Sequence, residues 1–339
     1  MNARIKVGLS YDLRDDYLKA GYSEIETAEM DQASTIESLV STLTQLGYSV
    51  DPIGHIKQLA QRLVDGDRWD IVFNICEGMH GLGREAQVPA LLDAYQIPYV
   101  FSDTLVCALT LHKAMTKDVV RAAGVATPDY VLVHSVADIK KVKLQFPLFA
   151  KPVAEGTGKG IDAESKITNS QQLIQVCKKL LAEYRQPVLV ERFLPGREFT
   201  VGIIGTGEQA SALATMEIVL LDGAEADVYS FNNKENWEQR VNYHLLADKR
   251  LRDKAEMVAL DAWRALGCRD GGRIDLRVDE LERVNFIEVN PLAGISPGYS
   301  DLPIMNSLLG NTYEDLIGRI MHSALQRQAK VEPTKAAAA

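Results

Sequence analysis

A β-hairpin expected between residues 271 and 291 constrains the fold of this chain more than any other segment. Apolar residues recur at every second position in Arg273–Val278 and again in Val284–Val289, which is the periodicity of paired strands. The polar run Asp279–Arg283 between them predicts the turn. A turn that closes at Leu281-Glu282 sets the register of both strands.

This register predicts a polar face on one side of the hairpin. It pairs Asp275 with Glu288 and Arg273 with Asn290, and it points all four side chains the same way. Two carboxylates and an amide oxygen are hard ligands that suit Mg²⁺, or Mn²⁺. The alternative is a solvated face with cross-strand ion pairs. We favour the metal site because four apolar residues are expected to bury the opposite face: Ile274, Leu276, Ile287 and Val289.

The first hundred residues alternate between strand and helix patterns, which predicts an open α/β sheet. Asp70–Ile75 has the continuous apolar run of a buried parallel strand. The other expected elements are strands at Arg4–Ser10, Tyr48–Ile53 and Ile97–Phe101, and helices that include Thr35–Leu46 and Ile56–Val64.

Two segments near this sheet are candidates for ligand contact. The acidic stretch Tyr11–Asp31 is either a solvated loop or a flap over a site. A glycine-rich segment, from Glu77 to Glu85, follows the buried strand at its carboxyl end, where ligands of open α/β sheets gather. We therefore take Glu77 and Glu85 as candidate substrate residues.

Lysines and glycines in the middle of the chain indicate a phosphate site. Lys151 ends the buried strand expected at Phe146–Val153 and needs an anionic partner, because an unpaired buried charge is costly. The following loop, Ala154–Gly160, can wrap its amides around phosphate oxygens, and we expect a flexible lid there. Lys113 begins a series at helical spacing, with Lys117 and Arg121, which is typical of an exposed basic face.

Composition excludes some partners. The 339 residues hold 37 basic and 46 acidic side chains, a net charge of −9, which disfavours nucleic acid and anionic membranes. No apolar run reaches the roughly 20 residues of a membrane span, and no signal peptide is visible, so we expect a cytoplasmic protein. The cysteines are scattered without a CxxC pair, which predicts reduced core thiols at Cys76, Cys107, Cys177 and Cys268.

Taken together, these motifs resemble the ATP-grasp superfamily and, within it, the D-alanine–D-alanine ligase family, over nearly the whole chain. The resemblance rests on the order of Lys113, Lys151 with its glycine loop, the segment from Glu191 to Thr200, and the hairpin. It implies an α/β ATP-grasp fold with a Rossmann-like N-terminal domain and two α+β lobes gripping ATP. We expect these units at residues 1–104, 105–195 and 196–330, followed by a disordered or artificial tail at 331–339.

The resemblance also implies roles for individual residues. ATP would be held by two phosphate lysines, the glycine loop, an adenine pocket and a ribose contact: Lys113 and Lys151; Glu155, Gly156, Thr157, Gly158, Lys159 and Gly160; Glu191, Phe193 and Leu194; and Glu198. Asp275, Glu288 and Asn290 would carry two Mg²⁺ ions. Lys234 would reach the reacting phosphate, while Arg273 and the Gly294 amide would stabilise a tetrahedral oxyanion. The implied enzyme is an ATP-dependent carboxylate–amine ligase, a homodimer that forms a peptide or amide bond between small molecules, amino acids above all, through an acylphosphate.

The substrate pockets depart from the family pattern. The family's Gly-Gly-x-Ser-x-Glu after the first strand is replaced by Val7–Tyr11 and the acidic stretch, and its acceptor-binding Ser-Leu pair reads Ser300-Asp301. The Asp301 carboxylate would repel that of an acceptor unless it turns to solvent or pairs with a cation. D-alanine is thus predicted to be a poor acceptor. Two alternatives stay open: a non-catalytic or regulatory nucleotide-binding protein, and a ligase of other amino acids or small metabolites.

Overall fold

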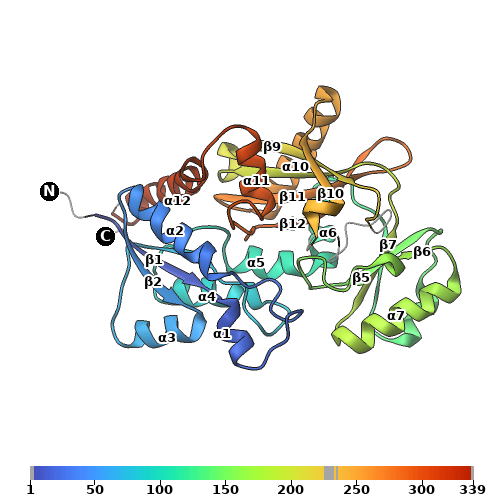
Figure 1. The fold of residues 1–339 in the computed structure, drawn as a ribbon, viewed down its shortest axis with the longest axis horizontal. Coiled ribbons are helices and arrows are strands. Elements are labelled where there is room, and N and C mark those ends of the chain that lie inside the picture. Colours follow the sequence, from blue (N-terminus) through green and yellow to red (C-terminus); the bar gives the residue numbers. More distant parts are fainter. Residues whose placement is uncertain (1–3, 225–232, 234–235, 337–339) are drawn as a thin grey trace.

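Three β-sheets organise the protein in the computed structural model, which describes residues 4–224, 233 and 236–336 (Figure 1). The N-terminal sheet is parallel, in the order β2-β1-β3, and β3 is buried along its whole length, as its continuous apolar sequence predicts. The elements of this unit are β1 (Lys6–Tyr11), α1 (Arg14–Lys19), α2 (Ala33–Gln45), β2 (Ser49–Gly54), α3 (Ile56–Val64), β3 (Ile71–Ile75) and α4 (Gln87–Ala94).

The expected strand at Ile97–Phe101 is wrong, because only one bridge forms there, between Tyr99 and Val72. Left-handed backbone conformations flank it, with φ of 55° at Gln96 and 74° at Phe101. These conformations turn the chain out of the extended geometry that a strand requires. The Phe101 amide instead donates to Asp270 Oδ2, at 2.9 Å.

A second, four-stranded sheet forms the central unit in the order β4-β7-β5-β6, with every pairing antiparallel. Two helices lead into it from the N-terminal unit, α5 (Thr104–Leu111) and α6 (Lys113–Ala122). The helix α7 packs on β5 and β7 and shares a core with them. The elements are β4 (Tyr130–Val133), β5 (Leu148–Pro152), β6 (Lys166–Ile167), α7 (Ser170–Tyr184) and β7 (Val188–Arg192).

The third sheet is antiparallel, in the order β10-β9-β8-β11-β12, and the hairpin is its edge. On one face α10 buries Trp263 against β8, β11 and β12. On the other face α11 and α12 join the N-terminal sheet in one apolar core, where Phe73 and Met216 belong to the same cluster. The elements are β8 (Glu198–Ile204), β9 (Ser211–Leu220), α9 (Trp237–Arg240), β10 (Val241–Leu245), α10 (Lys249–Leu266), β11 (Gly271–Val278), β12 (Val284–Asn290), α11 (Asp301–Leu308) and α12 (Tyr313–Ala336).

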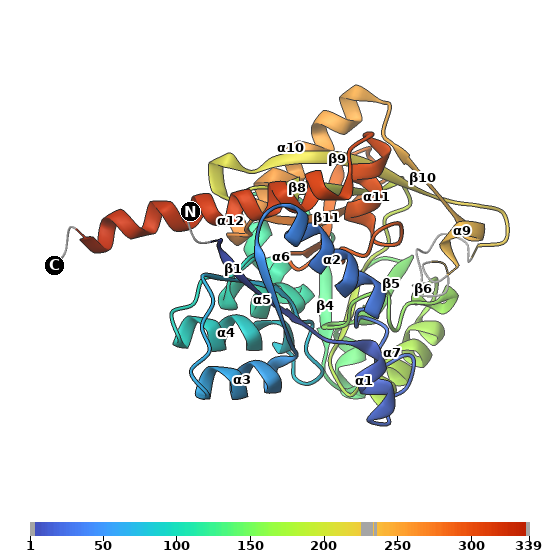
Figure 2. The same ribbon diagram turned by 60° about the vertical axis from the view of Figure 1, so that its left-hand side comes forward.

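The C-terminal helix extends away from the body of the molecule (Figure 2). It continues to Ala336, and the disordered or artificial tail expected at residues 331–339 stays a prediction.

All four cysteines are free and buried, as the sequence predicted. Within the described residues, no helix combines the length and the apolar character needed to cross a membrane.

Candidate active site

The hairpin has the register predicted at its polar end. Asp275 pairs with Glu288 and Arg273 with Asn290. Nearer the turn, however, Val278 pairs with Val284, which is a register shifted by one residue. The shift is a bulge in β12 opposite the Asp275/Leu276 step, which leaves one residue of β12 without a partner.

The unpaired residue is Ile287, and its predicted burial on the apolar face is wrong. Ile287 lines a cavity beside Glu288, whereas Phe286 is the residue that packs in the core under α10. A bulge lets two consecutive side chains depart from strict alternation. The other three apolar residues of that face, Ile274, Leu276 and Val289, are buried as expected.

The carboxylates of the polar face already have partners. Asp275 accepts from the Thr200 hydroxyl at 2.9 Å and from Arg273 Nη1 at 2.6 Å, and Asn290 Nδ2 lies 3.5 Å from it. Glu288 forms an ion pair with Lys151 at 2.8 Å. Among the described residues, no three His, Cys, Asp or Glu side chains could hold a metal by themselves. A cation here would therefore also depend on the Asn290 oxygen and on oxygens of a ligand.

The lysines of α6 are not an exposed basic face, as their spacing suggested. Lys117 is fully buried and pairs with Glu191 at 2.8 Å, while its ammonium also donates to Thr127 Oγ1. Burial lowers the pKa of Lys117 and of Lys113. Only Arg121, a turn further along, is exposed. The helix therefore turns its lysines inward, toward acids from other sheets.

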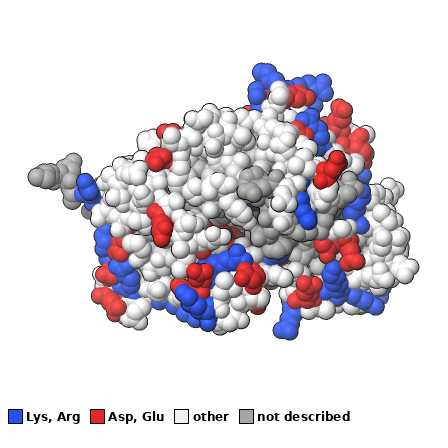
Figure 3. Space-filling model, in the orientation of Figure 1, with Lys and Arg blue, Asp and Glu red and all other residues white. Residues whose placement is uncertain are grey.

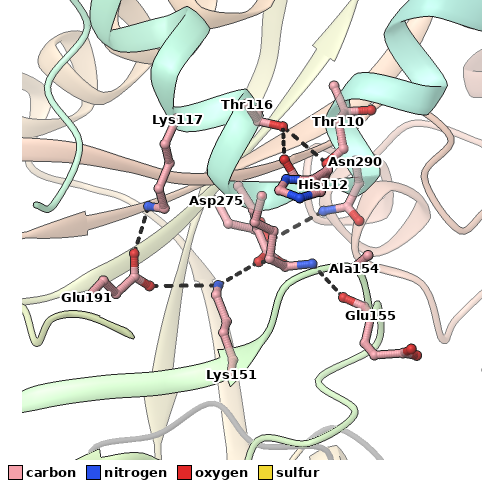
Figure 4. A network of polar contacts seen from close by, with 12 residues as sticks. Thr110, His112, Thr116, Lys117, Lys151, Ala154, Glu155, Glu191, Asp275 and Asn290 are labelled. Carbon is pink, nitrogen blue, oxygen red and sulfur yellow. Dashed lines mark hydrogen bonds and ion pairs between the residues drawn. The ribbon is translucent and has the colours of Figure 1, made fainter. Parts of the chain in front are cut away.

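These lysines meet two strands in one buried network (Figure 4). Lys151, on β5, lies 3.9 Å from Glu191 and 2.8 Å from Glu288. Lys113 lies 3.9 Å from Glu288 and donates to the Glu155 carbonyl at 2.5 Å. Burial opposes the charge of Lys151, but Glu288 and Glu191 together raise its pKa. The neighbouring carboxylates thus favour the charged form of Lys151.

A small cavity opens beside this network, bounded by β5, β7, β8 and the hairpin. Phe193 and Leu194 are almost fully buried in its wall, and Arg277 lies over the Phe193 ring at 4.8 Å. Arg277 also pairs with Glu198 at 3.1 Å. Arg277 was not predicted as a site residue, although its period-2 spacing from Arg273 and Asp275 indicates that all three side chains lie on the same face of the strand. The cavity is lined by Phe149, Lys151, Gly158, Ile161, Glu191, Arg192, Phe193, Leu194, Glu198, Asp275, Arg277, Ile287 and Glu288.

The glycine loop after β5 is tied to the N-terminal unit by Glu29. This carboxylate is paired with Arg84 at 2.9 Å and with Lys159, in the loop, at 3.1 Å. Burial opposes ionisation of Glu29, yet these two cations lower its pKa. A Cβ at Gly156 would lie 2.2 Å from Glu29 Oε1, so only glycine allows this approach. Arg84 also donates to the Ala154 carbonyl.

A larger cavity, of about 430 Å³, lies between the N-terminal unit and the C-terminal sheet. Figure 3 shows charged side chains gathered at the rim of a hollow near the centre of this face. The cavity brings together the residues predicted for substrate and oxyanion: Glu77, Glu85, Arg273, Gly294, Ser300 and Asp301. Lys234 lies outside the described residues. Glu288 lines both cavities, so the two meet at the hairpin.

The acidic stretch is not merely a solvated loop, because its end forms part of the cavity wall. Glu29 and Asp31 line the cavity, whereas Asp15 and Asp16 are exposed. Asp12 is buried and accepts from the Gly78 amide, which joins the stretch to the segment after β3. The sequence named this stretch as a possible flap but did not single out Asp31.

Asp301 turns toward Arg273 rather than toward solvent. Its Oδ2 lies 3.4 Å from Arg273 Nε, and both side chains are nearly buried. Burial opposes the charge on Arg273, but Asp275 and Asp301 raise its pKa. Ser300 Oγ accepts from the Ser296 amide at 3.1 Å. The carboxylate that was expected to repel an acceptor is thus paired with a cation.

The wall opposite the hairpin carries three acids with raised pKa values. Burial raises the pKa of Glu85 to about 7, with Arg84 acting against the rise and Glu29 adding to it. Burial and the neighbouring Glu85 and Glu29 raise the pKa of Glu77 well above its usual range. Burial and Asp12 raise the pKa of Asp31 to about 7.

Comparison with known proteins identifies D-alanine–D-alanine ligases among the relatives of this chain. Residues 119–322 match the family model described as D-ala D-ala ligase C-terminus. The D-alanine–D-alanine ligase of Aquifex aeolicus is 31% identical over 288 residues, covering 85% of this chain and 93% of the relative. That of Ralstonia pickettii is 33% identical over 253 residues, covering 73% of each.

Solved structures show the same fold. The D-alanine–D-alanine ligase of Bacillus anthracis, solved with ATP, superposes with a TM-score of 0.74 at 20% identity, covering 97% of this chain and 99% of that one. The VanG D-Ala:D-Ser ligase of Enterococcus faecalis superposes with a TM-score of 0.73 at 19% identity, covering 95% and 100%.

Proposed function

The chain belongs to the D-alanine–D-alanine ligase family and is an ATP-dependent ligase that forms carbon–nitrogen bonds, and from this premise we propose that it joins two amino acids through an acylphosphate. One observation carries the proposal. Glu288 lines both the small cavity and the large one. A nucleotide in the first and a carboxylate substrate in the second would therefore meet at the hairpin.

The small cavity suits the nucleotide. Phe193 and Leu194 would contact adenine together with Glu191, and Glu198 would contact the ribose. Lys113 and Lys151 would hold the phosphates, because both are buried ammonium groups beside Glu288. The glycine loop from Glu155 to Gly160 would cover the phosphates with its amides.

The polar face of the hairpin suits a divalent cation, since Asp275, Glu288 and Asn290 supply hard oxygen donors. We propose that they hold two Mg²⁺ ions, or Mn²⁺, together with phosphate oxygens. When bound, the metal would neutralise phosphate charge. Because Asp275 and Glu288 are paired with Arg273 and Lys151 in the free protein, ligand binding would exchange these partners.

The protein's own groups would then act on the substrates in the large cavity. Arg273 and the Gly294 amide lie on its hairpin side and would stabilise the oxyanion that forms when an amine attacks the acylphosphate. Lys113 and Lys151 would stabilise the charge on the transferred phosphate. Lys234 would approach the same phosphate. No nucleophilic side chain is required.

Release of ADP is the direct test. Purified protein is mixed with ATP, Mg²⁺ and amino acids singly and in pairs, D-alanine with D-alanine included. ADP together with a dipeptide mass, formed with one amino acid or with a pair, would support the ligase. ADP formed without any dipeptide would identify a kinase reaction instead, and absence of ADP with every amino acid and every pair would contradict the proposal.

The family also leads us to propose a cytoplasmic homodimer with domains at residues 1–104, 105–195 and 196–330. Light scattering during gel filtration measures the mass, and a monomer of 37.4 kDa would contradict the dimer. Limited proteolysis tests the domain boundaries.

A further inference from the structure

Three carboxylates on the N-terminal wall of the large cavity form no ion pair with a cation of the described residues. Asp31, Glu77 and Glu85 all line it. Among the described residues, none of the three side chains forms a hydrogen bond or an ion pair. They come from the end of the acidic stretch and from the segment after β3. The wall therefore presents three carboxyl groups to whatever occupies the cavity.

The cations that line the cavity are already engaged. Arg14 pairs with Glu24, and Lys113 lies beside Glu288 and the Glu155 carbonyl. Arg273 is held between Asp275 and Asp301. The lining contains seven acids, Glu29, Asp31, Glu77, Glu85, Glu155, Glu288 and Asp301, against three bases, Arg14, Lys113 and Arg273.

Cations behind the wall balance only part of this excess. Arg84 and Lys159 pair with Glu29, Lys159 also pairs with Glu155, and Lys151 pairs with Glu288. Among the described residues, no such cation lies within ion-pair distance of Asp31, Glu77 or Glu85. Burial and neighbouring acids raise their pKa values, and the field of Arg84 offsets only part of the rise at Glu77 and Glu85.

We infer that one of the two substrates is an amino acid with a second cationic group, whose two positive charges are held by Asp31, Glu77 and Glu85. A single α-ammonium group brings one positive charge against three carboxylates, and a second cationic group would offset more of this excess. An acidic amino acid would find no unengaged cation on the described lining. This inference rests on the proposed function, which assigns the large cavity to the amino acids.

The test compares two ligands of the same size. Ornithine and norleucine have side chains of four non-hydrogen atoms and differ at the terminal group, which is an ammonium in one and a methyl in the other. Each enantiomer is titrated by calorimetry into protein holding Mg²⁺ and a non-hydrolysable ATP analogue. We expect at least one ornithine enantiomer to bind at least about tenfold more tightly than the same enantiomer of norleucine. This is the effect of one well-placed ion pair.

Proton release gives a second readout. Binding of a cation should ionise carboxylates that are partly protonated, so ornithine should release protons between pH 6 and 8, and norleucine fewer. The charged groups that face these carboxylates are Asp12, Glu29, Arg84 and Lys113.

Variants localise the effect. At least one of Glu77→Gln and Glu85→Gln should reduce the preference for ornithine over norleucine about tenfold, because the carboxylate that faces the second ammonium acts on ornithine alone. Glu183→Gln, which removes an exposed acid from α7 outside both cavities, is the matched control and should keep the preference. If a variant does not fold, the comparison of ligands on the wild type still decides.

Equal affinity for ornithine and norleucine, or a preference that survives both variants, would overturn the inference. The proposed ligase fails separately, through absence of ADP release with every pair of amino acids. Binding of ornithine is measured without turnover, so the two failures are distinguishable.

Discussion

In the small cavity every carboxylate lies within 4 Å of a cation, whereas in the large cavity Asp31, Glu77 and Glu85 pair with no cation in the described part of the chain. The paired acids are Glu191 with Lys117, Glu198 with Arg277, Asp275 with Arg273 and Glu288 with Lys151. We call the small cavity, which is proposed for the nucleotide, the balanced side, and the large cavity, which is proposed for the amino acids, the unbalanced side.

The difference indicates two ways of receiving a charged ligand. On the balanced side an anion and its metal must displace the existing ion pairs. The electrostatic free energy of binding is then the difference between the ion pairs of the free protein and those of the complex. On the unbalanced side a cation meets carboxylates that have no partner to lose. Charge should therefore control selectivity more strongly in the large cavity than in the small one.

The largest expected effect is on turnover. Glu288→Gln removes the carboxylate shared by the two cavities and should reduce kcat by about a thousandfold or more, the size of a lost electrostatic group at a reaction centre. The protein should stay folded, because Lys151 keeps Glu191 nearby. The measurement is ADP release at saturating Mg²⁺, with circular dichroism as the control. Turnover equal to the wild type would remove Glu288 from the reaction centre.

The second-largest expected effect is on the stability of the protein and comes from an ion pair of the balanced side. Lys117→Met should lower the free energy of unfolding by about 3 kcal/mol, because it leaves Glu191 buried with only the more distant Lys151. Urea unfolding measures this change. Lys113→Met, on the same helix, is the comparison and should weaken ATP binding with a smaller loss of stability. The reverse order would show that Lys113 supports the fold and Lys117 the ligand.

The unbalanced side should appear in the pH dependence of stability. Asp31 and Glu85 have folded-state pKa values of about 7, above the unfolded values near 4. The folded protein then binds more protons between these pH values, so the free energy of unfolding should fall as pH rises from about 4 to 7, by up to about 3 kcal/mol per group. Urea unfolding at several pH values measures the slope.

Asp31→Asn should flatten that slope, since the amide does not titrate. An unchanged slope in the variant would show that Asp31 is not held protonated. Glu183→Gln again serves as the control, because its acid is exposed.

Nucleotide affinity should respond more modestly. Lys151→Ala removes one charge-assisted contact with phosphate and should weaken ATP binding by about 2 kcal/mol. Part of the loss is offset because Glu288 is released from its ion pair. Calorimetry with a non-hydrolysable analogue measures the change. Unchanged affinity would make Lys151 a structural partner of Glu288 only.

The smallest effect concerns the acceptor. Asp301→Leu removes one of the two carboxylates that neutralise Arg273 and should raise activity with D-alanine as acceptor about tenfold. Dipeptide formation is the measurement. Efficient D-alanyl-D-alanine synthesis by the wild type, or no gain in the variant, would show that Asp301 does not disfavour acceptors with a carboxylate.

Local patterns predicted the balanced side well. The alternation around the hairpin gave the pairing of Asp275 with Glu288, and the period of the third helix gave Ile56–Val64. The bulge at Ile287 was not predicted, because a strictly alternating pattern assumes that every residue of a strand has a partner on the neighbouring strand. The burial of Lys117 was not predicted, because helical spacing shows which residues share a face but not which part of the protein packs against that face.

The unbalanced side could not be predicted from spacing. Asp31 and Glu77 come from loops after different strands, and they approach because parallel strands end at one edge of the sheet. The link from Arg84 to Glu29 joins residues 55 positions apart, and Arg273 meets Asp301 across a loop. Such contacts depend on how the units pack, and no single segment carries that information.

Glu29 is shared between the two sides, since it holds Lys159 of the glycine loop and Arg84 beside the acid wall. A nucleotide that draws Lys159 away leaves Glu29 to Arg84 alone and changes the field at Glu77 and Glu85. Binding free energies form a closed cycle, so the factor by which the nucleotide alters amino-acid affinity must equal the factor by which the amino acid alters nucleotide affinity. The Glu29 carboxylate would thus couple the binding of the two ligands.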